Sequence, residues 1–232
     1  FEGVISLTYA VNDGNGALVK ANQSFTIKQA VLEGNNQTES LTGNGRDEWI
    51  YAYNGFDTIR AAGGDDRAYG GYGNDNIYGG SGNDQLYGEQ DDDVLRGGAG
   101  NDDLWGNAGD DTINGGIGGD YIKPGAGNDV IDGGENGTDQ WSGEAVFDIV
   151  SFEGNYADYE IEDKDVDGVL TLTVTDTDPN GEGVNTIKNV EIFQFADQQV
   201  FVSPTKTQIK MWDPIKQAEV QKGYFISGSI FG

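Results

Sequence analysis

One nine-residue pattern repeats nine times without interruption over residues 52–132, and it constrains the fold more than any other feature of the chain. The pattern reads Gly-Gly-x-Gly-x-Asp-x-apolar-x, with its clearest copies at 70–78, 79–87, 97–105 and 115–123. A short fixed period is typical of arrays in which each unit packs only against its neighbours. The chain is therefore expected to form a stack of similar layers.

Each unit combines turn-forming residues with a very short strand. Six residues favour a turn, and the glycines permit backbone conformations that a Cβ forbids. The last three residues form a strand stub whose middle side chain points inward while its neighbours point outward. The inward positions are apolar: Ile59, Ala68, Ile77, Leu86, Leu95, Leu104, Ile113, Ile122 and Ile131. Two units then make one turn of a flattened coil, with units 18 residues apart stacked directly on each other.

The sixth position of every unit is an aspartate, and these aspartates predict a bound cation. They are Asp57, Asp66, Asp75, Asp84, Asp93, Asp102, Asp111, Asp120 and Asp129. Stacked strands lie ~4.8 Å apart, so the carboxylates form two ladders in which each disfavours the ionised form of its neighbours. Residues 47–139 contain 20 acidic and 4 basic residues, a net charge of −16. A thin core cannot readily offset this repulsion together with the ordering entropy of the backbone.

Calcium is the cation that best fits such a coil. Ca²⁺ suits flexible all-oxygen cages of carboxylates and backbone carbonyls better than Mg²⁺ does. If each ion bridges one unit to the unit two positions later, the nine units hold about seven Ca²⁺ ions, which nearly balance the local charge. The alternative is a solvated β-solenoid without metal, but the strict spacing of aspartate and glycine argues against it.

The motif is similar to the calcium-binding β-helix repeat of RTX (repeats-in-toxin) proteins. Residues 70–132 resemble it closely, and 42–69 and 133–143 resemble degenerate copies. The resemblance implies an all-β fold, a right-handed parallel β-roll with two nine-residue units per turn and flanking β-strand caps. It also implies a bacterial protein that is secreted or on the cell surface, exported by the type I secretion machinery and folded on meeting external calcium. Because the chain begins without a signal peptide, we expect a fragment of a larger, adhesin-like protein.

The resemblance also implies which residues bind the metal. The repeat aspartates would supply carboxylates, with Asp47 and Asp139 doing so at the two ends. Loop carbonyls would come from Gly71, Gly73, Gly80, Gly82, Gly98, Gly100, Gly116, Gly118, Gly125 and Gly127. Units 52–60 and 61–69 depart most from the pattern because alanine and tyrosine replace their leading glycines. Asp91 and Asn107 also replace glycine, but both residue types tolerate a left-handed backbone.

The flanking segments divide the chain further. Residues 1–33 read as a β-hairpin, either the end of a cadherin-like or immunoglobulin-like repeat or a local cap on the roll. The roll is expected over 34–143, with Trp49 inward at its start, and a β-rich C-terminal cap over 144–203 covers its open end. Residues 204–232 are basic and then apolar, as in an export signal or a linker to a further domain.

Two loops in the expected cap resemble the first half of an EF-hand calcium loop, D-x-D-x-[DN]-G. They contain Asp163, Asp165 and Asp167, and Asp176, Asp178 and Asn180. Neither loop has the glutamate expected at position 12. They are therefore either extra calcium sites or acidic hairpin turns.

An aromatic row offers an alternative function. Tyr69, Tyr87 and Trp105 occupy outward last positions of stacked units. Such a row could bind an extracellular polysaccharide or a cell surface, which would make the chain a carbohydrate- or surface-binding module. The same row is equally expected from ordinary cross-strand pairs or from contact with the cap.

Composition excludes several other classes of function. The net charge of −27 opposes binding to nucleic acid or anionic membranes. The chain has no cysteine and no histidine, so thiol chemistry and the commonest general base are missing. No apolar run approaches the ~20 residues of a membrane-spanning helix. Every paired carboxylate belongs to a ladder or an acidic turn, so we expect no enzymatic activity.

Overall fold

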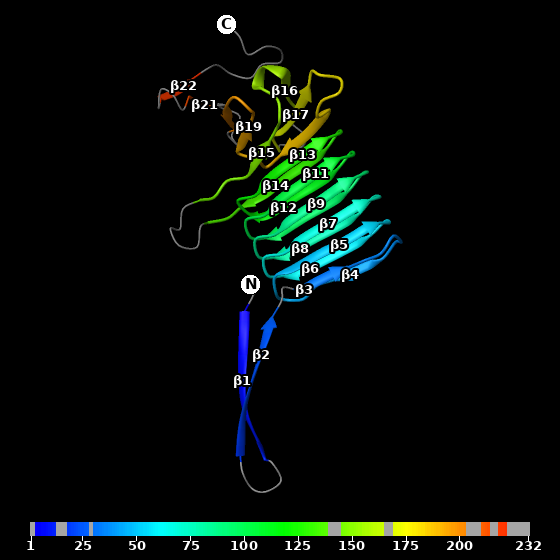
Figure 1. The fold of residues 1–232 in the computed structure, drawn as a ribbon. Helices are drawn as coiled ribbons and strands as arrows, with labels where there is room; N and C mark the ends of the chain where they lie inside the picture. The colour runs from blue at the N-terminus through cyan, green and yellow to red at the C-terminus, as the bar shows by residue number, and fades with distance from the viewer. Residues whose placement is uncertain are drawn as a thin grey trace.

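The structure, a computed structural model, is an all-β solenoid of about six turns (Figure 1). It describes residues 3–12, 18–27, 30–138, 145–164, 169–202, 210–213 and 218–221. Within these residues the helical structure is one 3₁₀ turn, η1 (Tyr156–Asp158). None of the described segments is a helix with the length and apolar character needed to cross a bilayer.

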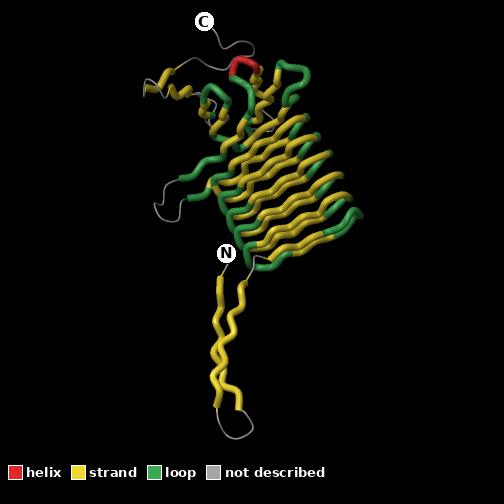
Figure 2. The backbone as a smooth tube through the Cα atoms, in the orientation of Figure 1, coloured by secondary structure: helices red, strands yellow, loops and turns green. Residues whose placement is uncertain are grey.

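Two parallel sheets form opposite sides of the coil, and successive strands alternate between them. One sheet contains β3 (Ala30–Glu33), β5 (Glu48–Asn54), β7 (Arg67–Tyr72), β9 (Gln85–Gln90), β11 (Asp103–Ala108), β13 (Tyr121–Ala126), β15 (Ile149–Ser151) and β19 (Ile192–Gln194). The other contains β4 (Ser40–Thr42), β6 (Thr58–Gly63), β8 (Asn76–Ser81), β10 (Val94–Ala99), β12 (Thr112–Gly118), β14 (Val130–Asn136) and β18 (Val184–Lys188). Figure 2 shows the regular stacking of these short strands.

The core of the roll consists of two columns of apolar side chains, one from each sheet, that fill the space between the sheets. In β10, Leu95 pairs with Ile77 on one side and Ile113 on the other, at a separation of 18 residues. All nine predicted inward residues of units 52–132 are at most 1% exposed. The predicted period, register and inward face are therefore confirmed.

At the start of the roll, the register of the nine-residue pattern is shifted by one residue from the predicted register. Glu48 occupies the sixth position and Ile50 the inward position, and both are fully buried. Trp49 was expected inward but is 37% exposed, with the Arg67 guanidinium 5.2 Å above its ring. The prediction was wrong because glutamate replaces aspartate here, so the nearby Asp47 appeared to mark the register.

Parallel pairing continues past residue 143, the expected end of the roll. After β14 the chain leaves the coil and re-enters it as β15, which pairs in parallel with β13. Strand β18 pairs in parallel with β14, and β19 with β15. The coil therefore persists through an insertion that no fixed period could have predicted.

Antiparallel strands then close this end of the coil. They are β16 (Tyr159–Asp163), β17 (Thr171–Asp176) and β20 (Gln199–Phe201). Strands β21 (Lys210–Asp213) and β22 (Ala218–Gln221) extend the sheet that contains β19 and β20. A β-strand cap of the kind expected is thus present.

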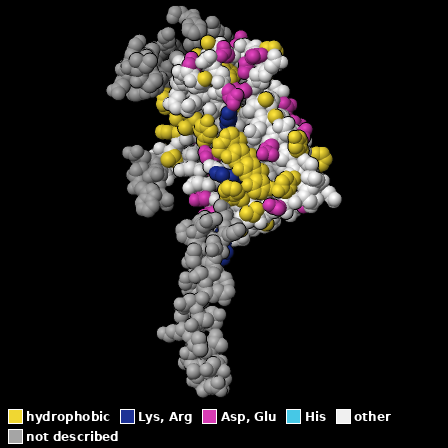
Figure 3. Space-filling view, viewed as in Figure 1, with side chains coloured by type: hydrophobic (Ala, Val, Ile, Leu, Met, Phe, Trp, Pro, Cys, Tyr) yellow, Lys and Arg dark blue, Asp and Glu magenta, His cyan; other side chains and the backbone are white. Residues whose placement is uncertain are grey.

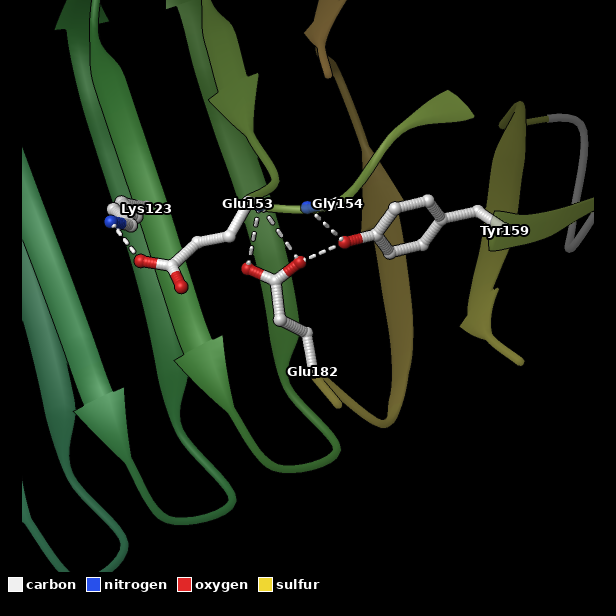
Figure 4. Close-up of polar contacts among 5 residues, drawn as sticks. All are labelled: Lys123, Glu153, Gly154, Tyr159 and Glu182. Atoms are coloured by element: carbon white, nitrogen blue, oxygen red, sulfur yellow. Dashed lines mark hydrogen bonds and ion pairs between the residues drawn. The ribbon is translucent and has the colours of Figure 1, made fainter. Parts of the chain in front are cut away.

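A polar cluster fastens the cap to the last turns of the roll (Figure 4). Lys123 of β13 forms an ion pair with Glu153 at 2.5 Å. The Glu153 and Gly154 backbone N–H groups donate to the Glu182 carboxylate (3.1 Å) and to the Tyr159 hydroxyl oxygen (3.0 Å). The Tyr159 hydroxyl in turn donates to the buried Glu182 carboxylate. Segments far apart in sequence are thereby joined.

The N-terminal hairpin forms a sheet of its own. Strands β1 (Gly3–Asn12) and β2 (Leu18–Ile27) pair in antiparallel register. The next strand, β3, already belongs to the coil through its parallel pairing with β5. The relation of the hairpin to cadherin-like or immunoglobulin-like repeats stays a prediction, as does the role of the tail.

Because the core is thin, each inward residue is important for stability. Replacing Leu95 with alanine should lower the free energy of unfolding of the calcium-loaded protein by about 2–5 kcal/mol, because the cavity lies between two stacked layers. Chemical denaturation measures this change. The control is Thr112→Ala on the exposed surface of β12, which should stay within about 0.5 kcal/mol of the parent. Equal effects of the two substitutions would contradict a core built from these columns.

Candidate metal centre

The sixth-position carboxylates form two buried ladders, one beside each sheet. The nine repeat aspartates, Asp57 to Asp129, are all at most 2% exposed. Each places its Oδ1 atom to accept the backbone N–H of the residue one full turn earlier. The Asp75 N–H thus donates to Asp93 at 2.7 Å, and the Asp84 N–H to Asp102 at 2.8 Å. One oxygen of every repeat carboxylate is therefore used to join successive turns.

The second oxygen of each carboxylate has no hydrogen-bond partner. This holds for the Oδ2 atoms of ten buried aspartates: Asp57, Asp66, Asp75, Asp84, Asp93, Asp102, Asp111, Asp120, Asp129 and Asp148. A buried carboxylate without a partner is costly, and proteins normally pair it or place it on a metal. The regular recurrence of the same unpartnered atom therefore indicates a cation ligand.

The raised pKa values of the buried aspartates also indicate that positive charge is missing around them. Burial, with a smaller contribution from neighbouring carboxylates, raises the pKa of Asp93 and Asp102 to about 8. Burial likewise raises the pKa of Asp84 and Asp120 to about 6. Because a cation stabilises the ionised form, these groups must either bind protons or bind metal.

Glycine at the first position allows the carboxylate to approach the next turn. A Cβ added at Gly97 would lie 2.3 Å from Asp102 Oδ2 and 2.5 Å from the carbonyl oxygen of Gly115. The same crowding recurs at Gly70, Gly79, Gly88, Gly106, Gly115 and Gly133. A carboxylate oxygen and a carbonyl oxygen therefore converge at each of these glycines, and a side chain there would displace them.

Three units carry a Cβ at this first position. Ala52, Ala61 and Pro124 stand there, in the units of Asp57, Asp66 and Asp129. The first two units are the ones that the sequence marked as departing most from the pattern. The loops themselves still form, because Tyr53 and Ala62 adopt the left-handed backbone with φ of 75° and 86°. The expected left-handed conformation of Asp91 and Asn107 is also confirmed, with φ of 72° and 75°.

The donor set fits calcium. Among the described residues, no three Asp, Glu, His or Cys side chains converge as a metal-binding group. The atoms that converge at Gly97 are instead one carboxylate oxygen and one backbone carbonyl oxygen, and both are hard oxygen donors. Ca²⁺ accepts roughly 6–8 such oxygens in flexible geometry, whereas Mg²⁺ demands a near-ideal octahedron. The residues present thus fit the predicted ion, while the number of ions stays a prediction.

The ladders begin with glutamates whose oxygens are satisfied by the protein itself. Asn44 donates to Glu48 through its backbone N–H at 3.0 Å and its side-chain Nδ2 at 2.6 Å. Asn35 donates to both oxygens of Glu39 in the same way, the Nδ2 contact being 2.7 Å. The longer side chain reaches donors in its own loop. The unpartnered oxygens therefore start only at Asp57.

Of the two predicted terminal ligands, the structure describes Asp47 but not Asp139. Asp47 is exposed at the fifth position, where its Oδ1 accepts the Asp65 backbone N–H at 3.0 Å. It belongs to an outer ladder in which Asp65 and Asn83 accept the N–H groups of Asn83 and Asn101, each at 2.8 Å. Asp47 therefore joins neighbouring loops, and Glu48 occupies the ladder position that was predicted for Asp47. Asp139 lies outside the described residues.

The cap loops show the geometry of turns where they are described. The two oxygens of Asp176 accept the backbone N–H groups of Asp178 at 2.8 Å and Glu182 at 2.9 Å. Asp178 accepts the N–H of Asn180 at 3.0 Å. These bonds show that the loop forms a tight acidic turn, and an extra calcium site there stays a prediction. In the other loop Asp163 is exposed at the end of β16, and Asp165 and Asp167 lie outside the described residues.

The predicted aromatic row is present and is longer than expected. Tyr51, Tyr69, Tyr87 and Trp105 stack with ring centroids 4.4–4.9 Å apart and interplanar angles of 1–7°. Figure 3 shows hydrophobic side chains gathered in one band across this view of the roll. Both faces of Tyr69 and Tyr87 are covered by neighbouring rings. Only the edges of these inner rings are open to a sugar, whereas a sugar stacks on the open face of an aromatic ring.

Sequence reasoning missed Asp148, which is fully buried and behaves like a repeat aspartate. Its Oδ1 accepts the Asp120 N–H at 2.8 Å, across 28 residues where the repeats span 18. Burial raises its pKa to about 7. The sequence signal that could have identified it is the spacing to Val150. In every repeat, too, a buried apolar residue follows the aspartate two positions later.

The comparisons with known proteins agree with this geometry. Residues 42–122 match, in four overlapping segments, the family model described as the RTX calcium-binding nonapeptide repeat. The segments are 42–71, 61–95, 69–104 and 87–122. The curated proteins include no significant match to the chain.

The raised pKa values give the metal-free protein a defined pH dependence. A carboxyl whose folded pKa lies above its unfolded value of about 3.9 contributes stability below that pH and loses it as the pH rises through the folded pKa. Without calcium the β-structure should therefore decline between about pH 4 and pH 8, as Asp93 and Asp102 ionise. Far-UV circular dichroism in calcium-free buffer measures this change.

Calcium supplies the control for that experiment, because it should hold the fold at pH 8. A metal-free protein equally folded at pH 5 and pH 8 would contradict the assigned role of the buried carboxyls.

Proposed function

Since residues 42–122 carry RTX calcium-binding nonapeptide repeats that form a β-solenoid, we propose that this chain is a non-catalytic module whose folding is controlled by calcium. The observation that supports this proposal most strongly is the series of buried Oδ2 atoms without a partner. Bound Ca²⁺ would supply the positive charge that the ladders lack. The aspartates hold the ion, and the glycines let successive turns approach it.

The module acts outside the cell. RTX repeats are typical of secreted bacterial proteins, and extracellular calcium modules bind with dissociation constants of ~10⁻⁴–10⁻³ M. At cytosolic calcium the ladders would stay repulsive, so the chain would remain unfolded and suited to export by a type I secretion machinery. After export, calcium would fold it into a rigid segment of a larger surface or secreted protein, such as an adhesin.

The aromatic row gives little support to the alternative of a carbohydrate-binding face. Its inner rings, Tyr69 and Tyr87, stack on each other and on Tyr51 and Trp105, so their faces are unavailable to a sugar. Half-buried stacked rings stabilise cross-strand pairs by about 0.5–1.5 kcal/mol each. We therefore assign these rings to the stability of the sheet.

Calcium titration of the metal-free chain tests the proposal. Far-UV circular dichroism should show a cooperative gain of β-structure with a midpoint of ~10⁻⁴–10⁻³ M. Magnesium at the same concentrations is the control, and it should restore little structure because of its stricter geometry. A chain that is folded without metal and indifferent to calcium at neutral pH would overturn the proposal.

A further inference from the structure

The two carboxylate ladders end differently in the cap, and this difference carries our inference. Beside the sheet of β14 and β18, the last member is Asn185. Beside the sheet of β13, β15 and β19, it is Asp148, followed by Glu191. Neither Asp148 nor Asn185 belongs to the uninterrupted repeat of residues 52–132.

The ladder that ends at Asn185 terminates without a charge. The Oδ1 atom of Asn185 accepts the Asp129 backbone N–H at 2.9 Å, as a repeat aspartate would. Its Nδ2 donates to the Glu182 carbonyl oxygen at 3.2 Å. Both ends of the amide are therefore satisfied within the protein, and no cation is required beside it.

The ladder that ends at Asp148 keeps an unsatisfied charge. Asp148 is fully buried, and its Oδ2 has no partner although its Oδ1 accepts the Asp120 N–H. Among the described residues, the ion pairs are Lys123 with Glu153 and Lys188 with Asp132, so no basic side chain reaches Asp148. A site of this kind needs a cation from solution.

The surroundings of Asp148 reproduce the metal-binding pattern of the repeats. A Cβ at Gly133 would lie 2.7 Å from Asp148 Oδ2 and 2.0 Å from the Asn189 carbonyl oxygen. One turn earlier, a Cβ at Gly115 would lie 2.3 Å from Asp120 Oδ2 and 2.4 Å from the Gly133 carbonyl oxygen. A glycine, a carboxylate oxygen and a backbone carbonyl oxygen therefore meet here as they do in the repeats. Asn189 supplies the carbonyl oxygen that a repeat glycine supplies elsewhere.

A second carboxylate lies at the same place. The Oε2 atom of Glu191 accepts the Asp148 backbone N–H at 3.1 Å, so Glu191 continues the ladder by one more step. The Asp148 carbonyl oxygen accepts the backbone N–H of Ile192 at 3.1 Å. Asp148 thus contacts both the preceding turn of the roll and β19, the last parallel strand of this sheet, which pairs with the cap strand β20.

We propose that Asp148, Glu191 and the Asn189 carbonyl hold a further Ca²⁺ ion at the junction between the roll and the C-terminal cap. This inference rests on the calcium-binding function proposed above, but it concerns residues outside the repeats. The ion joins β15 to β19, so docking of the cap becomes calcium-dependent like folding of the roll. The opposite ladder needs no such ion because Asn185 closes it.

Asp148→Asn tests the site, because it keeps an oxygen for the Asp120 N–H while removing the charge. Isothermal titration calorimetry should count one Ca²⁺ fewer than in the parent chain. Hydrogen exchange in saturating calcium should show lost protection at Ile192 in β19, while the amides of β8 to β12 stay protected. Those roll amides show whether the variant still folds.

Two further variants sharpen the test. Gly133→Ala fills the space beside Asp148 Oδ2 without changing any charge, and should also remove one ion. Asp84→Asn is the matched control within the repeats: it should lower the stoichiometry while β19 keeps its protection. Asp84 is equally buried, and its Oδ1 accepts the Asp66 N–H at 2.8 Å.

The possible failures are distinguishable. A parent chain that binds no calcium would overturn the proposed function itself. A parent chain that binds calcium, together with Asp148→Asn and Gly133→Ala variants that bind the same number of ions and protect β19 equally, would overturn only the junction site.

Discussion

The structure depends on one electrostatic constraint, the burial of carboxylates in two ladders with only one oxygen of each group satisfied by the protein. The satisfied oxygen accepts a backbone N–H from the neighbouring turn, which fixes the spacing of the layers. The other oxygen has no partner, so the folded coil carries a demand for positive charge. A hard divalent cation beside these oxygens would meet this demand, and folding would then be coupled to metal binding, as proposed above.

The remaining features of the roll serve that arrangement. Glycine at the first position leaves room for a carboxylate and a carbonyl oxygen from different turns, as beside Gly97. Because the loops take most of each unit, one inward apolar residue per unit reaches the core, and Ala52 and Ala61 add a second in their units. The outer surface compensates with stacked contacts, such as the Tyr78 ring between the guanidinium groups of Arg60 and Arg96, each 5.2 Å away. Such contacts stabilise adjacent layers but cannot neutralise the buried ladders.

The two ends of the coil show how the constraint is relieved without repeats. At the N-terminal end, Glu48 receives hydrogen bonds from Asn44. At the C-terminal end, Asn185 closes one ladder with an amide. Asp148 alone among these end residues keeps an unpartnered oxygen, which is why the junction with the cap stands out as a place for a further ion.

The sequence by itself determined the repeating part of this protein, because a strict period of nine assigns every residue of units 52–132 to a loop, a ladder or the core. The left-handed Asp91 and Asn107 followed from the same register. Only the tertiary structure decided the ends, since register there depends on pairing with the preceding turn. Glu48 replaces the expected Asp47 because glutamate can hold the ladder position when Asn44 supplies donors. Asp148 rejoins the ladder 28 residues after Asp120 because β15 pairs with β13, a contact between segments that no local pattern encodes.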